Sequence, residues 1–109
     1  MTSLLSRAKS LPNQPGIYKF FDGQGQLLYI GKAKNLKNRV SSYFQKTNQL
    51  TAVKLDMVNK VVVIDYIVVN NETEALLLET TLIKKHKPPY NIDLKDDKSW
   101  YFIALSKET

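Results

Sequence analysis

The side chain with the clearest capacity for chemistry in this sequence is Glu79, a carboxylate that stands among aliphatic residues. With the period of an α-helix, a helix over residues 72–85 places Glu79 near the middle of an apolar face. That face consists of Ala75, Leu76, Leu78, Leu82 and Ile83, and Leu77 lies outside it. Burying an unpaired carboxylate costs several kcal/mol, so we expect Glu79 to be protonated, paired with a Lys or Arg, or bound to a metal ion. A structural ion pair and a functional carboxylate are both open at this point.

A second set of polar residues follows the spacing of one side of a helix. Lys32, Arg39 and Tyr43 are separated by seven and four residues, so a pair of cations and a phenol would share one edge. Lys34 and Lys37 lie on other sides of such a helix. For these two lysines, a general attraction for phosphate and simple solubility both fit.

Two tyrosines flank a predicted β-hairpin. The runs Gly16–Phe21 and Leu27–Gly31 are rich in aromatic and β-branched residues and enclose the turn sequence Asp22-Gly23-Gln24-Gly25. A loop of two or four residues would place Tyr18 and Tyr29 on the same face of the hairpin, and a Gly23-Gln24 loop would place them directly opposite each other. Without a further observation, such a pair is ordinary sheet packing.

The remaining elements follow from hydrophobic periodicity and from helix start signals. Asn71 with Glu74 three residues later is typical of a helix start, and the two prolines after Lys87 end that helix. The predicted elements are a helix over Ala33–Phe44, a weakly patterned helix over 47–60, a strand over Val61–Val69, a helix from Glu72 to about Lys85 and a strand over Tyr101–Leu105. This order predicts an α+β fold with a small antiparallel sheet.

Composition limits the possible classes of protein. The chain has 109 residues, no cysteine and one histidine, which excludes a disulfide scaffold, a zinc ribbon, a thiol nucleophile and a histidine-rich metal site. The length fits one compact domain over residues 1–109. We find no apolar run of membrane-spanning length and no secretory signal at the start, so we expect a cytoplasmic protein without a membrane partner.

The positive charge is concentrated in one stretch. The net charge is +6, and residues 32–60 alone carry seven basic residues against one acidic residue. Residues 61–83 carry four acidic residues and no basic one. Basic residues clustered on one face favour a polyanionic partner such as DNA, although a solvated basic surface without a partner fits the charge equally well.

The two hairpin strands contain a pair of short motifs that identify a family. Gly16-Ile17-Tyr18 followed by Tyr29-Ile30-Gly31 resembles the motif of the GIY-YIG nucleases. The resemblance extends over nearly the whole chain and is greatest to the amino-terminal nuclease domain of bacterial nucleotide excision repair proteins of the UvrC type. It includes the blocks Gly31 to Val40, Ser42 to Phe44, Glu74 to Glu79, Leu82 to Lys85, Lys87-Pro88, Tyr90-Asn91 and Leu94 to Ser99.

The resemblance implies a metal-dependent DNA endonuclease with an antiparallel sheet of about three strands flanked by helices. In such a domain Glu79 would hold one Mg²⁺ or Mn²⁺ ion, since a single suitable carboxylate indicates one metal. Tyr29 would activate the attacking water, with Tyr18 beside it. The choice of the base among the tyrosines stays open, because a phenol with a pKa near 10 needs nearby positive charge, here Lys32 and the metal, to act at neutral pH.

The remaining site residues are implied by the same resemblance. Arg39 would contact the scissile phosphate through a planar fork that Lys cannot copy, so we expect Arg39→Lys to damage cutting. Lys32 and Tyr43 would support that centre, and Asn91 would help to order it. The residues expected to bind DNA are Lys32, Lys34, Lys37 and Arg39.

Two other functions remain open. A domain with this fold could bind DNA without cutting it, or could dock on a partner protein through its basic surface. The resemblance also implies a partner of the UvrB type, which would bind through regions that this sequence does not contain. The chain is therefore expected to be a domain of a longer repair nuclease, acting in the incision 3′ of a lesion, or a stand-alone relative of one.

Overall fold

The computed structural model describes residues 3–94, so the predicted strand over Tyr101–Leu105 lies outside the described residues. The elements in chain order are α1 (Leu4–Lys9), β1 (Gly16–Phe21), β2 (Leu27–Ala33), α2 (Leu36–Gln45), the 3₁₀ turn η1 (Thr47–Gln49), α3 (Ala52–Lys60), β3 (Val63–Val68), α4 (Glu72–His86) and α5 (Pro89–Leu94). No helix within residues 3–94 is both long enough and apolar enough to span a bilayer.

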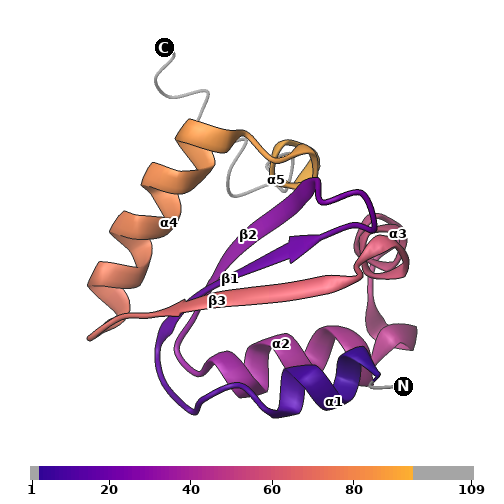
Figure 1. Cartoon of the computed structure of the whole chain (residues 1–109), viewed down its shortest axis with the longest axis horizontal. Coiled ribbons are helices and arrows are strands. Elements are labelled where there is room, and N and C mark those ends of the chain that lie inside the picture. Colours follow the sequence, from indigo (N-terminus) through magenta and orange to yellow (C-terminus); the bar gives the residue numbers. More distant parts are fainter. Residues whose placement is uncertain (1–2, 95–109) are drawn as a thin grey trace.

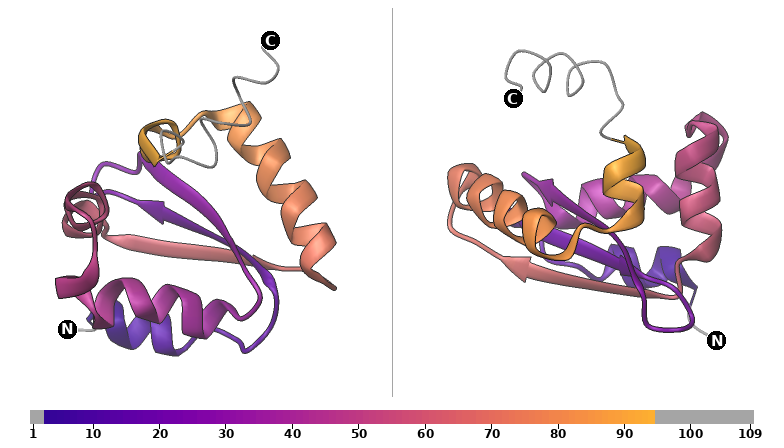
Figure 2. Two further views of the ribbon diagram at one scale, coloured as in Figure 1. Left: turned by 180° about the vertical axis from the view of Figure 1, so that it is seen from behind. Right: turned by 90° about the horizontal axis from the view of Figure 1, so that it is seen from above.

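The three strands form one antiparallel sheet in the order β2-β1-β3, which confirms the predicted α+β class. Helices α1 and α2 lie together below the sheet in Figure 1, and α4 runs along its other face. Helix α5 packs against β2 (Figure 2). The strand β2 is therefore flanked by α4 and α5, whereas the opposite edge strand, β3, is largely exposed.

Side-chain alternation along β1 divides the core into two clusters, as expected for a sheet that is covered on both faces. Tyr18 and Phe20 point toward α1 and α2 and join the larger cluster, which also contains Val40 and Tyr43 of α2. Ile17 points the other way and packs with Ile30 and the residues of α4.

The β1–β2 hairpin does not have the Gly23-Gln24 loop that would place Tyr18 and Tyr29 directly opposite each other. Tyr18 and Tyr29 share a face, as predicted, but Tyr18 lies opposite Gly31 and Phe20 lies opposite Tyr29. A two-residue loop does not form, because Asp22 organises a longer turn. Its Oδ1 accepts hydrogen bonds from the N–H groups of Gln24 and Gln26, and the ladder shifts by one residue beyond Phe20. The two tyrosines are consequently diagonal neighbours.

This register explains the glycine of the second motif. A Cβ atom on Gly31 would lie 2.3 Å from Cζ and the hydroxyl oxygen of Tyr18, so only glycine lets the phenol ring lie flat across β2. The glycine of the first motif has a similar role, because a Cβ on Gly16 would lie 2.2 Å from the carbonyl oxygen of Ile67 in β3. Both motif glycines therefore allow close packing.

The first predicted helix begins three residues later than expected. Asn35 caps α2 by accepting a hydrogen bond from the N–H of Asn38, and Ala33 belongs to β2. Lys32 consequently lies in a strand, so the helical spacing that was expected to align it with Arg39 and Tyr43 was wrong. Helices α1 and α5 were not predicted, because six residues are too few to show a periodicity.

Helix α4 begins at the predicted residue, but its buried face is narrower than predicted. Asn71 accepts from the N–H of Glu74, and the helix runs to His86, one residue past the predicted end. Ala75 is buried, and Leu78, Leu82 and Ile83 pack against the sheet. Leu76, predicted for the same face, is 48% exposed, because the sheet covers a narrower part of the helix than the sequence pattern indicated.

Candidate active site

Three tyrosine side chains meet beneath the β1–β2 hairpin. The ring of Tyr18 lies 6.1 Å from that of Tyr29 and 5.8 Å from that of Tyr43, measured between centroids. The hydroxyl groups of Tyr18 and Tyr43 share a hydrogen bond of 2.9 Å. Tyr18 and Tyr43 are buried and Tyr29 is half-buried, so Tyr29 is the phenol of the three that a solvent molecule reaches most readily.

The environment disfavours ionisation of two of these phenols. Burial raises the pKa of Tyr29 well above its ordinary value, and the proximity of Tyr43 and Glu79 adds to the shift, while Arg39 lowers it. The pKa of Tyr18 is raised for the same principal reason. The cation that acts against the shift is Arg39, and not Lys32 as the sequence suggested.

Arg39 connects the tyrosine cluster to the surface. Its guanidinium carbon lies 5.5 Å from the ring centroid of Tyr43, within the range of a cation–π contact. The pKa of Arg39 is raised, chiefly by Tyr18. Because the side chain is exposed, its fork of donors is available to a ligand.

Glu79 lies on the other side of β2, against Lys32. It is half-buried, and this burial raises its pKa above the ordinary value, while the charge and the backbone N–H of Lys32 act in the opposite direction. The sequence left open a protonated acid, an ion pair and a metal ligand. Lys32 offsets the shift only in part, and a cation bound to this carboxylate would lower its pKa further.

The surroundings of Glu79 fit a hard divalent cation. No group of three His, Cys, Asp or Glu side chains that could enclose a metal occurs among residues 3–94. From the described residues, a metal at Glu79 would therefore have fewer than three His, Cys, Asp or Glu ligands, and water or substrate oxygens would complete its coordination. Mg²⁺ tolerates this arrangement because it retains several waters and commonly binds through one or two carboxylates together with phosphate.

Asn91 holds the outer edge of β2. Its carboxamide oxygen accepts from the N–H of Ile30 at 2.8 Å, and its Nδ2 donates to the carbonyl oxygen of Ile30 at 2.8 Å. The side chain is buried, so these bonds replace the partner strand that β2 lacks on this side. Asn91 thereby fixes the backbone between Tyr29 and Gly31, which carries the motif side chains.

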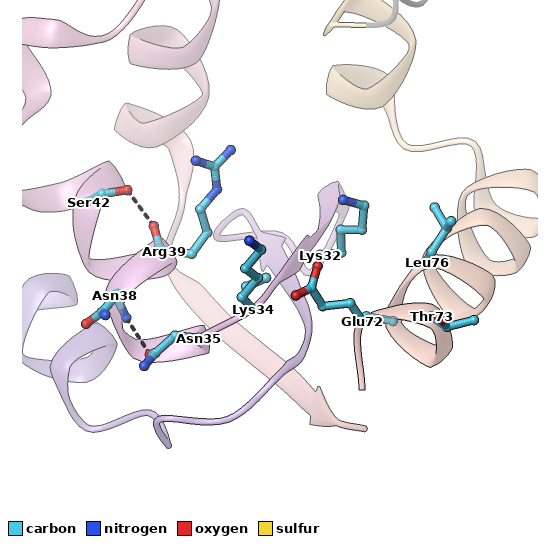
Figure 3. A pocket seen from close by; sticks show the side chains of 11 residues that line it. Lys32, Lys34, Asn35, Asn38, Arg39, Ser42, Glu72, Thr73 and Leu76 are labelled. Atoms are coloured by element: carbon cyan, nitrogen blue, oxygen red, sulfur yellow. Dashed lines mark hydrogen bonds between the residues drawn. The ribbon is translucent and has the colours of Figure 1, made fainter. Parts of the chain in front are cut away.

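A cleft opens between α2 and the start of α4 (Figure 3). Its volume is about 670 Å³, and its lining includes Lys32, Lys34 and Arg39, three of the four residues expected to bind DNA. Lys37, the fourth, is not among the lining residues, because it lies on another side of α2. The structure thus brings Lys32, Lys34 and Arg39 together at the end of β2, where Lys32 faces Glu79.

Several lining residues were missed by the sequence analysis. Asn38 and Ser42 lie on α2, one and two turns after its N-cap, and could have been found had the Asn35 cap signal been used to place the helix. Glu72 lies in the first turn of α4, and its carboxylate points into the cleft in Figure 3. Leu76 was assigned to the core, and no local sequence pattern distinguishes it from its buried neighbours.

Comparisons with known proteins agree with this geometry. The model of a family described as the UvrC-like GIY-YIG domain matches residues 14–92. This chain belongs to the UvrC-like GIY-YIG family. The matched residues contain the hairpin, the tyrosine cluster, the cleft, Glu79 and Asn91.

Curated relatives in this family are much longer than the chain. The UvrABC system protein C of Symbiobacterium thermophilum is 52% identical over 94% of this chain, which corresponds to 16% of that relative. The protein of the same name from Pseudomonas fluorescens is 55% identical over 85% of this chain and 15% of its own length. The chain therefore spans about a sixth of these GIY-YIG relatives.

Solved structures match the GIY-YIG fold over almost their whole length. The N-terminal endonuclease domain of UvrC from Thermotoga maritima, bound to its catalytic magnesium, is 38% identical with a TM-score of 0.71, over 83% of this chain and 98% of that one. Variants of that domain with one tyrosine changed to phenylalanine, or an asparagine changed to alanine, are likewise bound to the catalytic divalent cation.

Proposed function

We propose that this chain is the metal-dependent DNA endonuclease domain of a UvrC-type protein and hydrolyses a phosphodiester bond in nucleotide excision repair. The observation that carries the proposal is the half-buried carboxylate of Glu79, which faces Lys32 at the end of β2 beside a cleft lined by cations. A carboxylate with this pKa shift, next to groups suited to phosphate, is typical of a functional site.

Glu79 would hold one Mg²⁺ or Mn²⁺ ion. The bound ion supplies positive charge that offsets the negative charge developing on the phosphate and on the leaving oxygen. A single ion is supported by the donor set, since a two-metal site usually requires several bridging carboxylates and no group of three His, Cys, Asp or Glu side chains that could hold a metal occurs among the described residues.

The other residues of the site act on the DNA and on the attacking water. Arg39 is placed to bind two oxygens of the scissile phosphate through its planar fork, and Lys32 adds a second positive charge at the end of β2. Tyr29 is the phenol that we assign to orient and activate the water, because it is the most accessible of the three. Since burial raises the pKa of Tyr29, it would act as a base only with a cation bound at Glu79 to lower that pKa. Tyr18 and Tyr43, joined through their hydroxyl groups, hold its ring and support Arg39.

Further partners follow from the longer relatives. We propose that the chain acts within a repair protein on the 3′ side of a lesion, together with a UvrB-type partner that binds to other regions of that protein. Lys34 and Lys37 would contribute general attraction for the DNA backbone. Such a role places the domain in the bacterial cytoplasm, where the DNA lies.

A plasmid-nicking assay with added Mg²⁺ or Mn²⁺ tests the proposal. We expect Glu79→Gln to lower the nicking rate by about a hundredfold or more while it leaves salt-dependent DNA affinity unchanged. Glu74→Gln is the matched control, because Glu74 is an exposed carboxylate on the same helix that does not line the cleft. Nicking that survives in Glu79→Gln would contradict the assignment of Glu79. No nicking by the wild type, with salt-dependent DNA affinity present, would favour the second function, a DNA-binding module without activity.

Metal binding gives an independent readout. Added Mg²⁺ should raise the melting temperature of the wild type and of Tyr29→Phe, because the ion binds to the folded chain through Glu79. The tyrosine variants of the Thermotoga domain that retain the cation support this expectation. Glu79→Gln should lose the shift, and a shift of equal size in that variant would contradict the assignment of Glu79.

A further inference from the structure

Leu76 is an exposed leucine inside a cleft whose other side chains are mostly polar. It is 48% exposed and lines the cleft together with Lys32, Lys34 and Arg39. A large apolar side chain in such a position loses contact with water only when a ligand covers it. A ligand that covers Leu76 while it contacts the cations would therefore need an apolar surface close to its anionic groups.

The two sides of the cleft differ in chemistry. The α2 side presents Arg39 with the polar side chains of Asn38 and Ser42, while the α4 side presents Leu76, Thr73 and Glu72 (Figure 3). Phosphate is attracted to the α2 side and repelled by the carboxylate of Glu72. A nucleotide that enters the cleft would therefore place its phosphate toward α2 and its sugar and base toward α4.

The position of Leu76 along α4 relates it to the proposed metal ligand. Leu76 precedes Glu79 by three residues, so the two side chains are neighbours on the same side of the helix, about 4.5 Å apart along its axis. A group that covers Leu76 would therefore lie close to Glu79. Within the cleft volume of about 670 Å³ there is room for a nucleotide-sized group.

We infer that Leu76 is the contact for the face of an unstacked nucleobase, the base of the nucleotide that adjoins the scissile phosphate. This inference rests on the proposed function and names its substrate class as DNA that is locally unpaired at the cut. In an intact duplex both faces of a base are covered by its stacked neighbours, so only an unpaired or extruded base offers a face to a leucine.

The neighbouring residue Leu77 provides a matched control. It is also a leucine on α4 and is 63% exposed, but it lies in a different hollow with Val69, Leu78 and Thr81. Replacing either leucine by alanine removes the same apolar surface from the same helix. A difference in DNA affinity between the two variants would therefore come from a contact in the cleft and not from a change in the helix.

Affinity for single-stranded oligonucleotides, measured by fluorescence anisotropy at low salt without divalent ions, tests the inference. One probe carries ordinary bases, and a matched probe of equal length carries abasic deoxyribose units. We expect Leu76→Ala to weaken binding of the base-bearing probe about threefold to tenfold and to leave the abasic probe unchanged. Leu77→Ala should change neither, and Leu76→Gln, which keeps helix propensity, should match Leu76→Ala.

Three results would overturn the inference. They are an equal loss in Leu77→Ala, a loss in Leu76→Ala that persists on the abasic probe, and no loss in either Leu76 variant. Thermal unfolding of each variant confirms that the comparison is between folded chains. Because no divalent ion is present, the outcome does not depend on whether Glu79 supports cutting, so failure of the base contact is separate from failure of the nuclease assignment.

Discussion

Each edge of the sheet carries a side-chain oxygen that accepts a hydrogen bond from a strand N–H, but in opposite environments. At the β2 edge, buried Asn91 accepts from Ile30 and also donates to it. At the β3 edge, exposed Asp65 accepts from the N–H of Tyr66 at 2.9 Å. Water can replace Asp65, whereas it has no access to the groups that Asn91 satisfies.

The difference shows why the site forms at only one edge. β3 is an exposed strand with apolar side chains at its surface, among them Val63, Ile67 and Val68. β2 is flanked by α4 and α5, which bring a carboxylate and a carboxamide to its outer side. Two polar side chains thus occupy the place of a fourth strand, and a fixed, partly dehydrated edge is a suitable place to hold a metal ligand.

Removal of the two edge side chains should give the largest contrast. Asn91→Ala leaves the buried N–H and C=O of Ile30 without partners, so we expect the free energy of unfolding to fall by about 2–4 kcal/mol. Asp65→Ala should change the free energy of unfolding by less than about 0.5 kcal/mol, because water can accept the hydrogen bond from the N–H of Tyr66. Urea denaturation of the metal-free chains measures both, and similar losses would show that burial does not distinguish the edges.

The close contact between β1 and β2 should be the next most sensitive feature. Gly31→Ala drives a methyl group into the Tyr18 ring, and we expect a loss of about 1–3 kcal/mol. In a Tyr18→Ala background the same substitution should hardly change the free energy of unfolding, because the ring that clashes with the new methyl group is absent. A double-mutant cycle with no coupling between Tyr18 and Gly31 would contradict this explanation.

The turn that leads to Asn91 should respond in the opposite direction. Lys87, the C-cap of α4, has a φ of 46°, a left-handed conformation that non-glycine residues adopt at a cost. We expect Lys87→Gly to raise the free energy of unfolding by about 0.5–1 kcal/mol. Lys85→Gly, on the exposed side of α4, is the control and should lower it, because glycine is a poor helix former.

The smallest effect should come from the contacts that link α5 to α3. The hydroxyl of Tyr90 donates to Asp56 and accepts from Lys60, and these bonds hold the pKa of the Asp56 carboxyl below its usual value. A lowered carboxyl pKa stabilises the fold above the unfolded pKa, and this stabilisation is lost as the pH falls through the folded pKa.

Tyr90→Phe should therefore lower the melting temperature slightly at neutral pH and hardly at all in acid, below the range in which Asp56 titrates. Melting curves from neutral pH down to about pH 2 test this expectation, since a carboxyl normally titrates near pH 4 and the pKa of Asp56 lies lower in the folded chain. A difference in melting temperature that grows as the pH falls would show that the stabilisation by Tyr90 does not depend on the charged carboxylate of Asp56.

Sequence reasoning was most successful where the deciding forces act between neighbours along the chain. The Asn71 cap, the extent of α4 and the shared face of Tyr18 and Tyr29 follow from helix and strand periods alone. The unusual position of Glu79 is likewise visible in the spacing of apolar residues, because a carboxylate on such a face requires an explanation. The family resemblance, confirmed by the family model, added the site residues that spacing could not connect.

Only the tertiary structure decided the hairpin register, the exposure of Leu76 and the contact of Asn91 with Ile30. The register depends on how Asp22 satisfies the turn, and the exposure of Leu76 depends on how much of α4 the sheet covers. Asn91 and Ile30 are 61 residues apart, and their hydrogen bonds exist because α5 packs against an edge strand. Local patterns record which residues prefer burial, whereas the partner that each polar group finds depends on chain segments that meet only in the folded state.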